Sequence, residues 1–333
     1  MKKNASLPHQ KTKEMTTGAV LDSYYLLENV HLRSTKAGNP FLSGTLRDAA
    51  GSVPFVMWDY AGGITPEDAG RVVYVSGTVG EYNGNTQVTA DEVALAGDQD
   101  DPYIPLSELV PVAPIDIEEA YRFIDDTLVA SMFKSKAADL ALKLVTDLKP
   151  VLLVSPAAKS VHHAFVGGWV MHTCNMLKMA KVFCDVYEES YPVNRALLYA
   201  GVVLHDIGKV HEFTLSELGL VKEYSLDGQI FGHSVIGETM VLEKACELGY
   251  SNEKDIKLLR HMILSHHGTP EMGAALQPMT LEAEILHYLD GLDSRMEIYR
   301  VALDGIPEGE ISEYVKALDK RIVKMPSAEK TEG

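Results

Sequence analysis

The stretch Leu204-His205-Asp206-Ile207-Gly208-Lys209 decides how the rest of this chain is interpreted. A histidine and an aspartate stand side by side at the end of an apolar helical segment. They are followed by a glycine that can end the helix and by a lysine. An adjacent His-Asp pair is common by chance, so the pair alone indicates little. It gains weight because histidine and aspartate recur on separate predicted helices, as His172, His233, His266, His267 and Asp290.

These residue types predict a two-metal phosphoesterase centre. Imidazole nitrogens and carboxylate oxygens suit Mn, Fe, Co, Ni or Zn, and an aspartate can bridge two cations. Helical bundles build dinuclear sites from side chains on separate helices. We assign one cation to His172, His205, Asp206 and Asp290. We assign the other to Asp206, His233 and one or both of His266 and His267, and the sequence leaves open which of those two is the ligand.

The expected chemistry gives roles to further residues. A water that bridges two close cations loses a proton near neutral pH and can attack phosphorus in line. Lys209 is expected to face phosphate oxygens in the pentacoordinate state, and a solvent-exposed lysine is the alternative. His163 and Asp293, the latter one helical turn from Asp290, are candidate substrate contacts. Other histidines are expected to be structural: His162, His211, His261 and His287.

Composition places the chain among globular proteins of about two domains. It has 333 residues, 46% of them hydrophobic, and no apolar run approaches the roughly 20 residues that span a bilayer. The first residues carry lysines but no apolar segment of a secretory signal. Cys174, Cys184 and Cys246 are widely spaced and odd in number, which indicates free thiols in a reducing cytosol. We therefore expect a cytoplasmic protein without a membrane partner.

The formal net charge of −17 argues against a general nucleic-acid coat protein, because phosphate binding usually needs a basic surface. A nucleic-acid enzyme remains compatible with this charge. Bound divalent cations would offset part of it where phosphates must lie.

Residues 20–96 predict a small β-barrel. Short runs bounded by turn residues give about five strands, and Asn83-Gly84 is a hairpin signal. An OB-fold fits this count, and an SH3-like barrel fits nearly as well. Phe41, Trp58 and Tyr82 are candidates for stacking on single-stranded bases, and Tyr82, beside the turn, is expected to be the most exposed. The expected strands are 24–32, 41–46, 53–58, 71–79 and 86–90.

The remainder predicts a linker and an all-α domain. Residues 97–115 are rich in aspartate and proline, which disfavours helix and central strand. Apolar residues at helical spacing then continue to about 325, except over 214–224, which is expected to be either irregular or a small hairpin. Residues 1–19 are expected to be disordered and 326–333 to form a tail. The expected helices are 116–131, 135–148 (ended by Pro150), 165–187, 194–206, 231–248, 251–265 and 281–303.

Five motifs together resemble the HD superfamily of metal-dependent phosphohydrolases, and more closely the YhaM family of 3′-to-5′ exoribonucleases. That family carries an N-terminal OB-fold before its HD domain, and the similarity extends from about residue 20 to 325. The resemblance implies manganese-dependent removal of nucleotides from the 3′ end of single-stranded RNA, with DNA as a second candidate. The products would be nucleoside 5′-monophosphates, and the OB-fold would guide the strand. The motifs are His162-His163-Ala-Phe-Val-Gly-Gly-Trp-Val-Met-His172, His205-Asp-Ile-Gly-Lys-Val, Gly232-His233, Leu264-Ser-His-His-Gly268 and Glu282-Ala-Glu-Ile-Leu-His-Tyr-Leu-Asp290-Gly-Leu-Asp293.

Two alternatives stay open at this point. A hydrolase of small cyclic or triphosphate nucleotides could use the same metals, but it has no need of an OB-like domain. A non-enzymatic OB-fold module would bind no stoichiometric transition metal, and all of its function would survive His205→Ala. The sequence also leaves the oligomeric state open, a homo-oligomer included.

Overall fold

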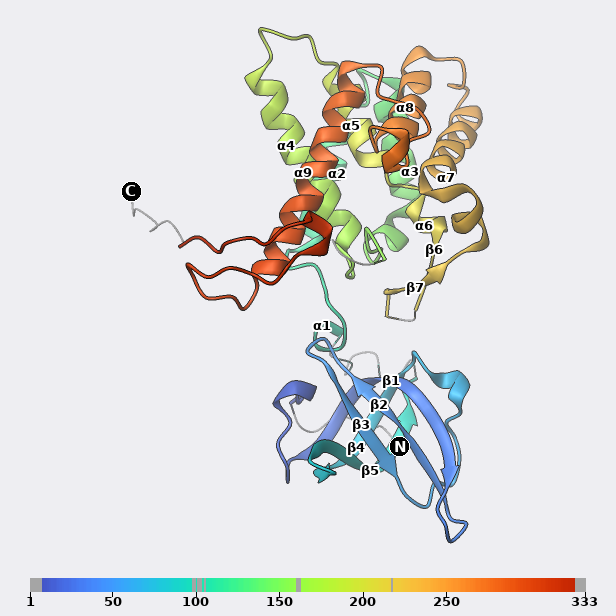
Figure 1. The fold of residues 1–333 in the computed structure, drawn as a ribbon. Coiled ribbons are helices and arrows are strands. Elements are labelled where there is room, and N and C mark those ends of the chain that lie inside the picture. The colour runs from blue at the N-terminus through green and yellow to red at the C-terminus, as the bar shows by residue number, and fades with distance from the viewer. Residues whose placement is uncertain are drawn as a thin grey trace. The chain divides into compact units, whose positions relative to one another are not determined.

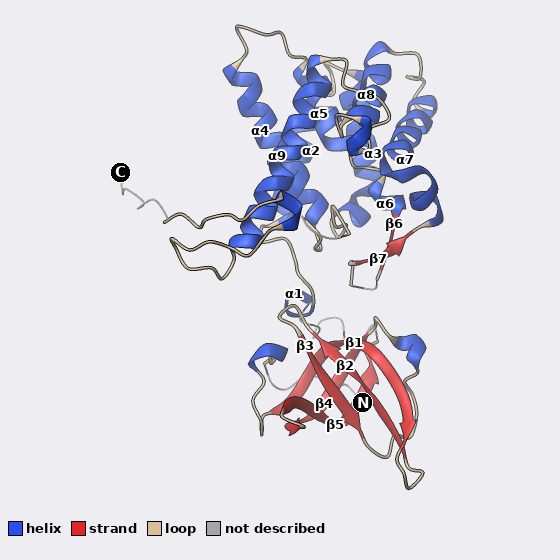
Figure 2. Cartoon of the chain, in the orientation of Figure 1, coloured by secondary structure: helices blue, strands red, loops and turns tan. Residues whose placement is uncertain are grey.

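The structure is a computed structural model that describes residues 8–97, 100, 104, 106–159, 163–216 and 218–326. The chain divides into two compact units, the first running to Val112 and including the short stretch Ser216–Leu218, and the second comprising the rest. The first is a β-barrel and the second is helical (Figures 1 and 2). This order of a barrel followed by a helical domain confirms the predicted fold class.

The barrel has the strand order of an OB-fold. Its strands close in the order β1-β2-β3-β5-β4, with β4 returning to pair with β1. The β3–β5 pair is parallel, while the other neighbours are antiparallel. A closed barrel leaves no free sheet edge, which protects a small domain from edge-to-edge association. The strands are β1 (Val20–Ser34), β2 (Pro40–Arg47), β3 (Ser52–Met57), β4 (Val72–Tyr82) and β5 (Asn85–Leu95).

Every second side chain along the strands points into the barrel and fills its interior. A tight turn connects β4 and β5. Leu27, Phe55 and Val75 are among the fully buried residues of this core. The β4–β5 turn places Asn83 at φ 52° and Gly84 at φ 77°. Two successive residues in the left-handed region fit a two-residue hairpin loop whose twist matches the strands, as the Asn-Gly pair predicted.

The segment before β1 packs on the barrel from residue 8 onward, although its composition led us to expect disorder over 1–19. Thr12, in the 3₁₀ turn η1 (Thr12–Glu14), is buried and donates its amide and hydroxyl to Asp48 at 2.6 and 2.7 Å. The amides of Ala50 and Gly51 donate to the same carboxylate at 2.9 and 2.8 Å. Burial raises the pKa of Asp48, but the hydrogen bonds from Thr12 and Gly51 outweigh it and hold the pKa below its usual value. Residues 1–7 lie outside the described part.

The predicted linker contains a single helical turn, α1 (Leu106–Leu109), which its composition did not predict. All four prolines of this segment, at 102, 105, 111 and 114, lie outside the turn in the sequence, so they do not interrupt it. Leu109 and Val110 are buried, so this end of the segment is anchored by apolar contacts.

The helical unit follows the predicted order of helices. Asp116, Asn194 and Thr280 cap three of them by accepting a hydrogen bond from a backbone amide three residues later. The predicted hairpin is present as β6 and β7. The elements are α2 (Ile117–Val129), α3 (Lys136–Leu152), α4 (Gly168–Val186), α5 (Arg195–Leu204), α6 (Lys209–Glu212), β6 (Phe213–Leu215), β7 (Val221–Tyr224), α7 (Leu226–Glu247), α8 (Lys254–Ser265) and α9 (Leu281–Leu303), with 3₁₀ turns η4 (Pro270–Met272) and η5 (Lys316–Leu318). The 3₁₀ turn η2 (Pro66–Asp68) belongs to the barrel unit.

Two helices differ from expectation. Pro150 does not end α3 but lies inside its last turn, and the helix continues to Leu152. Helix α7 starts at Leu226, five residues earlier than predicted from 231, and is broken at Gly232, which has φ 70° and ψ 159°. A glycine tolerates this φ without a Cβ clash, so the chain can change direction just before His233.

Helix α5 is the centre of the helical unit. Every residue from Ala196 to Leu204 is buried, and α3, α4, α8 and α9 pack around it. A helix that is apolar on all sides must be covered on all sides by other parts of the protein. The next two residues, His205 and Asp206, therefore lie in the interior of the unit. Among the described helices, none is long and apolar enough to cross a membrane.

Candidate metal centre

The His-Asp pair lies at the buried end of α5. His205 is the C-cap of the helix and is 0% exposed, and Asp206 follows at 3%. Gly208 follows as the N-cap of α6 and lies in close contact with α7. A Cβ built at Gly208 would lie 2.0 Å from the carbonyl oxygen of His233. Since Gly208 has an ordinary helical φ of −63°, this position needs a glycine for space and not for its backbone angle.

Two clusters of metal-binding side chains flank Asp206. One consists of His172 from α4, His205, and Asp290 from α9, with candidate ligand atoms within 4.8 Å of one another. The other consists of His233, His266 and His267, within the same limit. We call these the first cluster and the second cluster.

Asp206 faces both clusters with different oxygens. Its Oδ2 lies 3.4 Å from His205 Nε2 and 4.0 Å from His172 Nε2, on the side of the first cluster. Its Oδ1 lies 3.5 Å from His233 Nε2 and 3.8 Å from His266 Nε2, on the side of the second cluster. A carboxylate in this position is placed to bridge two cations.

Hydrogen bonds set the orientation of four of the imidazoles. In each case Nδ1 lies within hydrogen-bond distance of an acceptor and donates to it, so Nε2 faces the cluster and carries the lone pair whenever the ring is neutral. The acceptors are Asp293 for His172 (2.7 Å), the Val202 carbonyl for His205 (2.8 Å), Glu212 for His233 (3.0 Å) and the Ile263 carbonyl for His266 (2.6 Å).

The Nε2 atoms of these imidazoles are suited to coordinate metal ions. Nε2 of His205, His233 and His266 is buried and has no hydrogen-bond partner among the described residues. Burying an unpaired polar atom costs free energy, and coordination to a cation would remove that cost. The donor set of imidazoles and carboxylates therefore suits divalent transition metals on both sides of Asp206.

The electrostatics of the clusters also favour a cation. Burial lowers the pKa of His266 well below its usual value, and neighbouring His205 and His267 lower it further. Burial would raise the pKa of Asp206, but Lys209 and His205 hold it well below its usual range. Burial and neighbouring His233 also lower the pKa of His267. His266 and His267 thus present neutral imidazoles beside the ionised carboxylate of Asp206.

His172 differs from the other imidazoles. Burial lowers its pKa, but Asp290 and Asp293 together outweigh that effect and raise the pKa to about 9. A cation bound at Nε2 would have to displace the proton that these carboxylates favour, so metal binding is linked to proton release.

Lys209 lies at the centre and not in solvent. Its Nζ is 2.6 Å from Asp206 Oδ2, and its side chain is 13% exposed. Burial lowers the pKa of Lys209, but the carboxylates of Asp206, Asp290 and Glu212 raise it above its usual value. The lysine therefore remains cationic beside Asp206.

His163 and Asp293 lie behind His172, where they are less accessible than the substrate contacts we expected. They are 1% and 6% exposed. One oxygen of Asp293 accepts hydrogen bonds from His163 Nε2 at 2.8 Å and His172 Nδ1 at 2.7 Å. Burial and these contacts favour support of His172 over contact with a substrate.

The histidines expected to be structural have mostly structural contacts. His261 accepts a hydrogen bond from the Met279 amide at 2.9 Å, and His287 donates to the His266 carbonyl at 2.9 Å. His211 lies within α6, and His162 lies outside the described residues. Glu212 was not among the predicted site residues, although it contacts His233.

The aromatic candidates of the barrel lie on its surface. Tyr82 is 63% exposed and Trp58 is 51% exposed. The rings of Phe41 and Trp58 are in contact, tilted, with centroids 5.0 Å apart. Phe55, which lies in the same strand region, is buried instead, because it points into the barrel.

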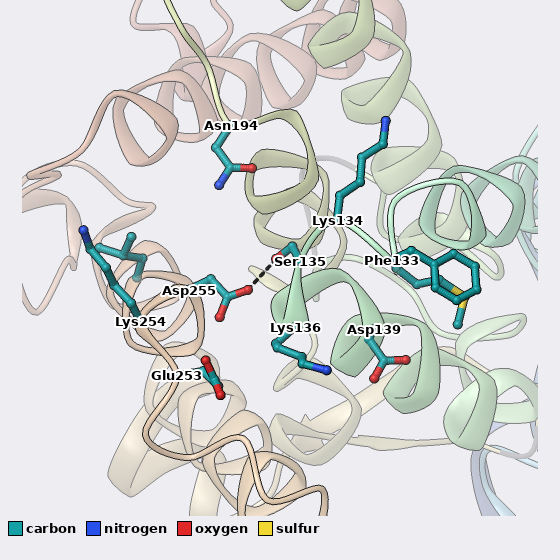
Figure 3. Close-up of a pocket in the computed structure, with 11 residues that line it drawn as sticks. Phe133, Lys134, Ser135, Lys136, Asp139, Asn194, Glu253, Lys254 and Asp255 are labelled. Carbon is teal, nitrogen blue, oxygen red and sulfur yellow. Dashed lines mark hydrogen bonds between the residues drawn. The ribbon is translucent and has the colours of Figure 1, made fainter.

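A cavity of about 700 Å³ lies elsewhere in the helical unit, between the starts of α3 and α8 (Figure 3). None of the cluster residues lines it. Its more buried carboxylates are already paired: Asp255 accepts from Ser135 Oγ at 2.7 Å and Asp139 accepts from Tyr250 at 2.7 Å. The two clusters and this cavity are therefore separate features of the helical unit.

Comparison with known proteins identifies the class of the helical unit. A family model described as "HD domain" matches residues 169–295. This range contains both clusters and Asp206, so the matched domain is the one that holds the candidate centre.

Relatives match over nearly the whole chain. The 3′-5′ exoribonuclease YhaM of Geobacillus sp. (strain WCH70) is 34% identical over 93% of this chain and 93% of its own. The proteins of the same name from Oceanobacillus iheyensis and Bacillus subtilis (strain 168) are 32% and 34% identical, covering 96% and 94% of this chain and 98% and 97% of theirs. The chain belongs to the family of the 3′-5′ exoribonuclease YhaM.

A solved structure also matches part of the chain. The second OB-fold domain of replication protein A from Methanococcus maripaludis covers 27% of this chain and 95% of its own, at 18% identity and a TM-score of 0.21. The OB-fold of the barrel follows from its strand order and not from this match.

Proposed function

We propose that this protein is a metal-dependent 3′-5′ exoribonuclease that shortens single-stranded RNA and releases nucleoside 5′-monophosphates. The observation that carries the proposal is Asp206, whose two oxygens face separate clusters of buried imidazoles and a carboxylate. The relatives named above supply the direction of cleavage and the substrate class. They do not favour a small-nucleotide hydrolase or a non-enzymatic module.

The ligands of the two cations follow the clusters. His172, His205 and Asp290 would hold the first cation, His233, His266 and His267 the second, and Asp206 both. Two divalent cations this close supply a water of lowered pKa and positive charge for phosphate oxygens. Manganese is the proposed metal because the family resemblance implies it, while the imidazole and carboxylate set also suits Fe, Co, Ni or Zn.

Lys209 would act at this centre through its positive charge. Its ammonium group is held at Asp206 Oδ2 and is kept protonated by the surrounding carboxylates. From there it would add positive charge beside a phosphate that becomes more negative as it is attacked. We propose that it stabilises this charge.

The barrel would hold the strand by stacking. Trp58 and Tyr82 present exposed rings, and a hollow of about 480 Å³ beside Tyr82 is also lined by Asn83, Asn85 and Gln87. Rings accept any base, and amide side chains can hydrogen-bond to base edges. Stacking would also compensate for the net charge of −17, which weakens phosphate contacts. We further propose a cytoplasmic protein that prefers RNA to DNA and can form a homo-oligomer.

The test is digestion of a single-stranded RNA labelled at its 5′ end, in parallel with one labelled at its 3′ end. With Mn²⁺, the 3′ label should leave first as a mononucleotide, while the 5′ label shifts through a ladder of shorter products. Asp206→Asn should show neither. A DNA strand of the same sequence and a panel of cyclic and triphosphate nucleotides test the substrate class. Rapid hydrolysis of a small nucleotide, with the RNA left intact, would refute the proposal.

A further inference from the structure

Glu212 is a buried carboxylate that the ligand set does not use. It is the last residue of α6 and is 6% exposed. Its Oε1 accepts two hydrogen bonds from His233, one from the backbone amide and one from Nδ1, each at 3.0 Å. Both the main chain and the ring of His233 are thus held by one oxygen.

The amide of His233 is available because α7 is broken at Gly232. The backbone of that glycine, with φ 70° and ψ 159°, interrupts the helix just before His233. A helix end leaves amides that need acceptors from outside the helix. Glu212 supplies that acceptor, and the close packing of Gly208 against the His233 carbonyl holds the two segments together.

The ring contact determines which nitrogen of His233 faces the centre. A carboxylate can only accept from Nδ1, so Nδ1 carries the proton and Nε2 carries the lone pair. That Nε2 lies 3.5 Å from Asp206 Oδ1 and belongs to the second cluster. A carboxylate behind a metal-bound imidazole also makes the ring a stronger ligand.

The same arrangement recurs on the other side of Asp206. There the carboxylate of Asp293 lies 2.7 Å from His172 Nδ1 in the first cluster. His205 in the first cluster and His266 in the second cluster also lie near Asp206, but their Nδ1 atoms donate to backbone carbonyls instead. Each half of the centre therefore contains one carboxylate-supported and one carbonyl-supported imidazole. The second half also contains His267, whose Nδ1 has no hydrogen-bond partner among the described residues.

We propose that Glu212 is a positioning residue that fixes the tautomer and direction of His233 and thereby sets the affinity of the second cation. This inference rests on the proposed two-metal centre. It predicts that changes at Glu212 weaken one of two cations selectively. A merely structural residue would instead lower stability and leave both affinities unchanged in the folded protein.

The test compares Glu212→Gln and Glu212→Ala with the control Glu223→Gln in the full chain. Glu223 lies in β7 with an exposed side chain, and Gln removes the same charge there. Mn²⁺ binding is measured by calorimetry, and Co²⁺ binding by its visible absorption. We expect Glu212→Ala to lower the affinity for one cation by roughly 10- to 100-fold. The affinity of Glu212→Gln should be intermediate between those of Glu212→Ala and wild type, and that of Glu223→Gln should equal that of wild type.

A second readout is the Mn²⁺ dependence of RNA hydrolysis. Glu212→Gln should lose activity at limiting Mn²⁺ and regain most of it at excess Mn²⁺, with little change in KM for RNA. If Glu212→Gln binds two cations as tightly as wild type, the inference is wrong, whether or not the protein cleaves RNA. If wild type binds two cations and the variant loses one, but no RNA is cleaved, only the proposed function fails. Wild-type protein that binds no cation would overturn both.

Discussion

Replacing Gly208 with alanine tests how closely α6 and α7 must approach for His233 to reach the centre. The new Cβ would lie 2.0 Å from the His233 carbonyl oxygen and 2.6 Å from the Gly237 amide nitrogen. Real Cβ atoms keep at least 3.0 Å, so the two backbones must separate by about 1 Å, the difference between these distances. Both atoms belong to the backbone, so no side-chain rotation can relieve the contact.

The expected cost follows from this shift. Overpacking of a buried contact costs about 1–3 kcal/mol, which lowers the melting temperature by about 2–4 °C per kcal/mol in a domain of this size. A displacement of about 1 Å in a catalytic constellation can cost on the order of 100-fold in rate. The affinity for one cation should fall as well, because His233 moves away from Asp206 Oδ1.

Gly201→Ala is the matched control. Its Cβ would lie 2.2 Å from Met262 Cε, the end of a flexible side chain that can turn away. Alanine also raises helix propensity by roughly 1 kcal/mol inside α5, which offsets part of the crowding. Thermal unfolding, calorimetry with Mn²⁺ and RNA hydrolysis are measured on both variants. The reasoning is refuted if Gly208→Ala keeps wild-type cation affinity and rate, or if Gly201→Ala loses as much.

Three further outcomes are expected. Asp48→Asn should lower the free energy of unfolding by about 1–3 kcal/mol at pH 7. The pKa of Asp48 is lower in the folded protein than its usual value of 3.8, so the stability difference between wild type and variant should stay constant above pH 3.8 and shrink as the pH falls through the folded pKa. Denaturant titrations at several pH values measure this difference, and a constant difference down to pH 2 would contradict the prediction. Trp58→Ala and Tyr82→Ala should each weaken binding of single-stranded RNA by about 1–3 kcal/mol in a filter or anisotropy assay, with cation affinity unchanged; unaltered binding would exclude the stacking role. Asp293→Asn should weaken one cation by roughly 10-fold or more through His172, as calorimetry would show, and equal affinities would leave Asp293 a packing residue.

Much of the fold could be predicted because its signals are local. The Asn83-Gly84 pair fits only a few tight turns, and the unbroken apolar run from Ala196 to Leu204 fits only a buried helix. The prediction was weaker where packing overrides composition. Thr12 and Asp48 are 36 residues apart, and only the folded barrel brings the hydroxyl to the carboxylate.

The candidate ligands could be predicted because few residue types bind transition metals, and because the motifs restrict their spacing. The supporting carboxylates could not be predicted in the same way. Glu212 and His233 are 21 residues apart, and they meet only because α7 is broken at Gly232. Asp293 was noticed for its spacing from Asp290, but its contact with His163, 130 residues away, comes from the tertiary fold.

The most direct measurement is the anomalous scattering of Mn²⁺ in crystals of the protein. Two peaks are expected on opposite sides of Asp206, one beside His205 and Asp290 and one beside His233 and His266. A single peak, or peaks away from Asp206, would contradict the claim that this carboxylate joins two cation sites.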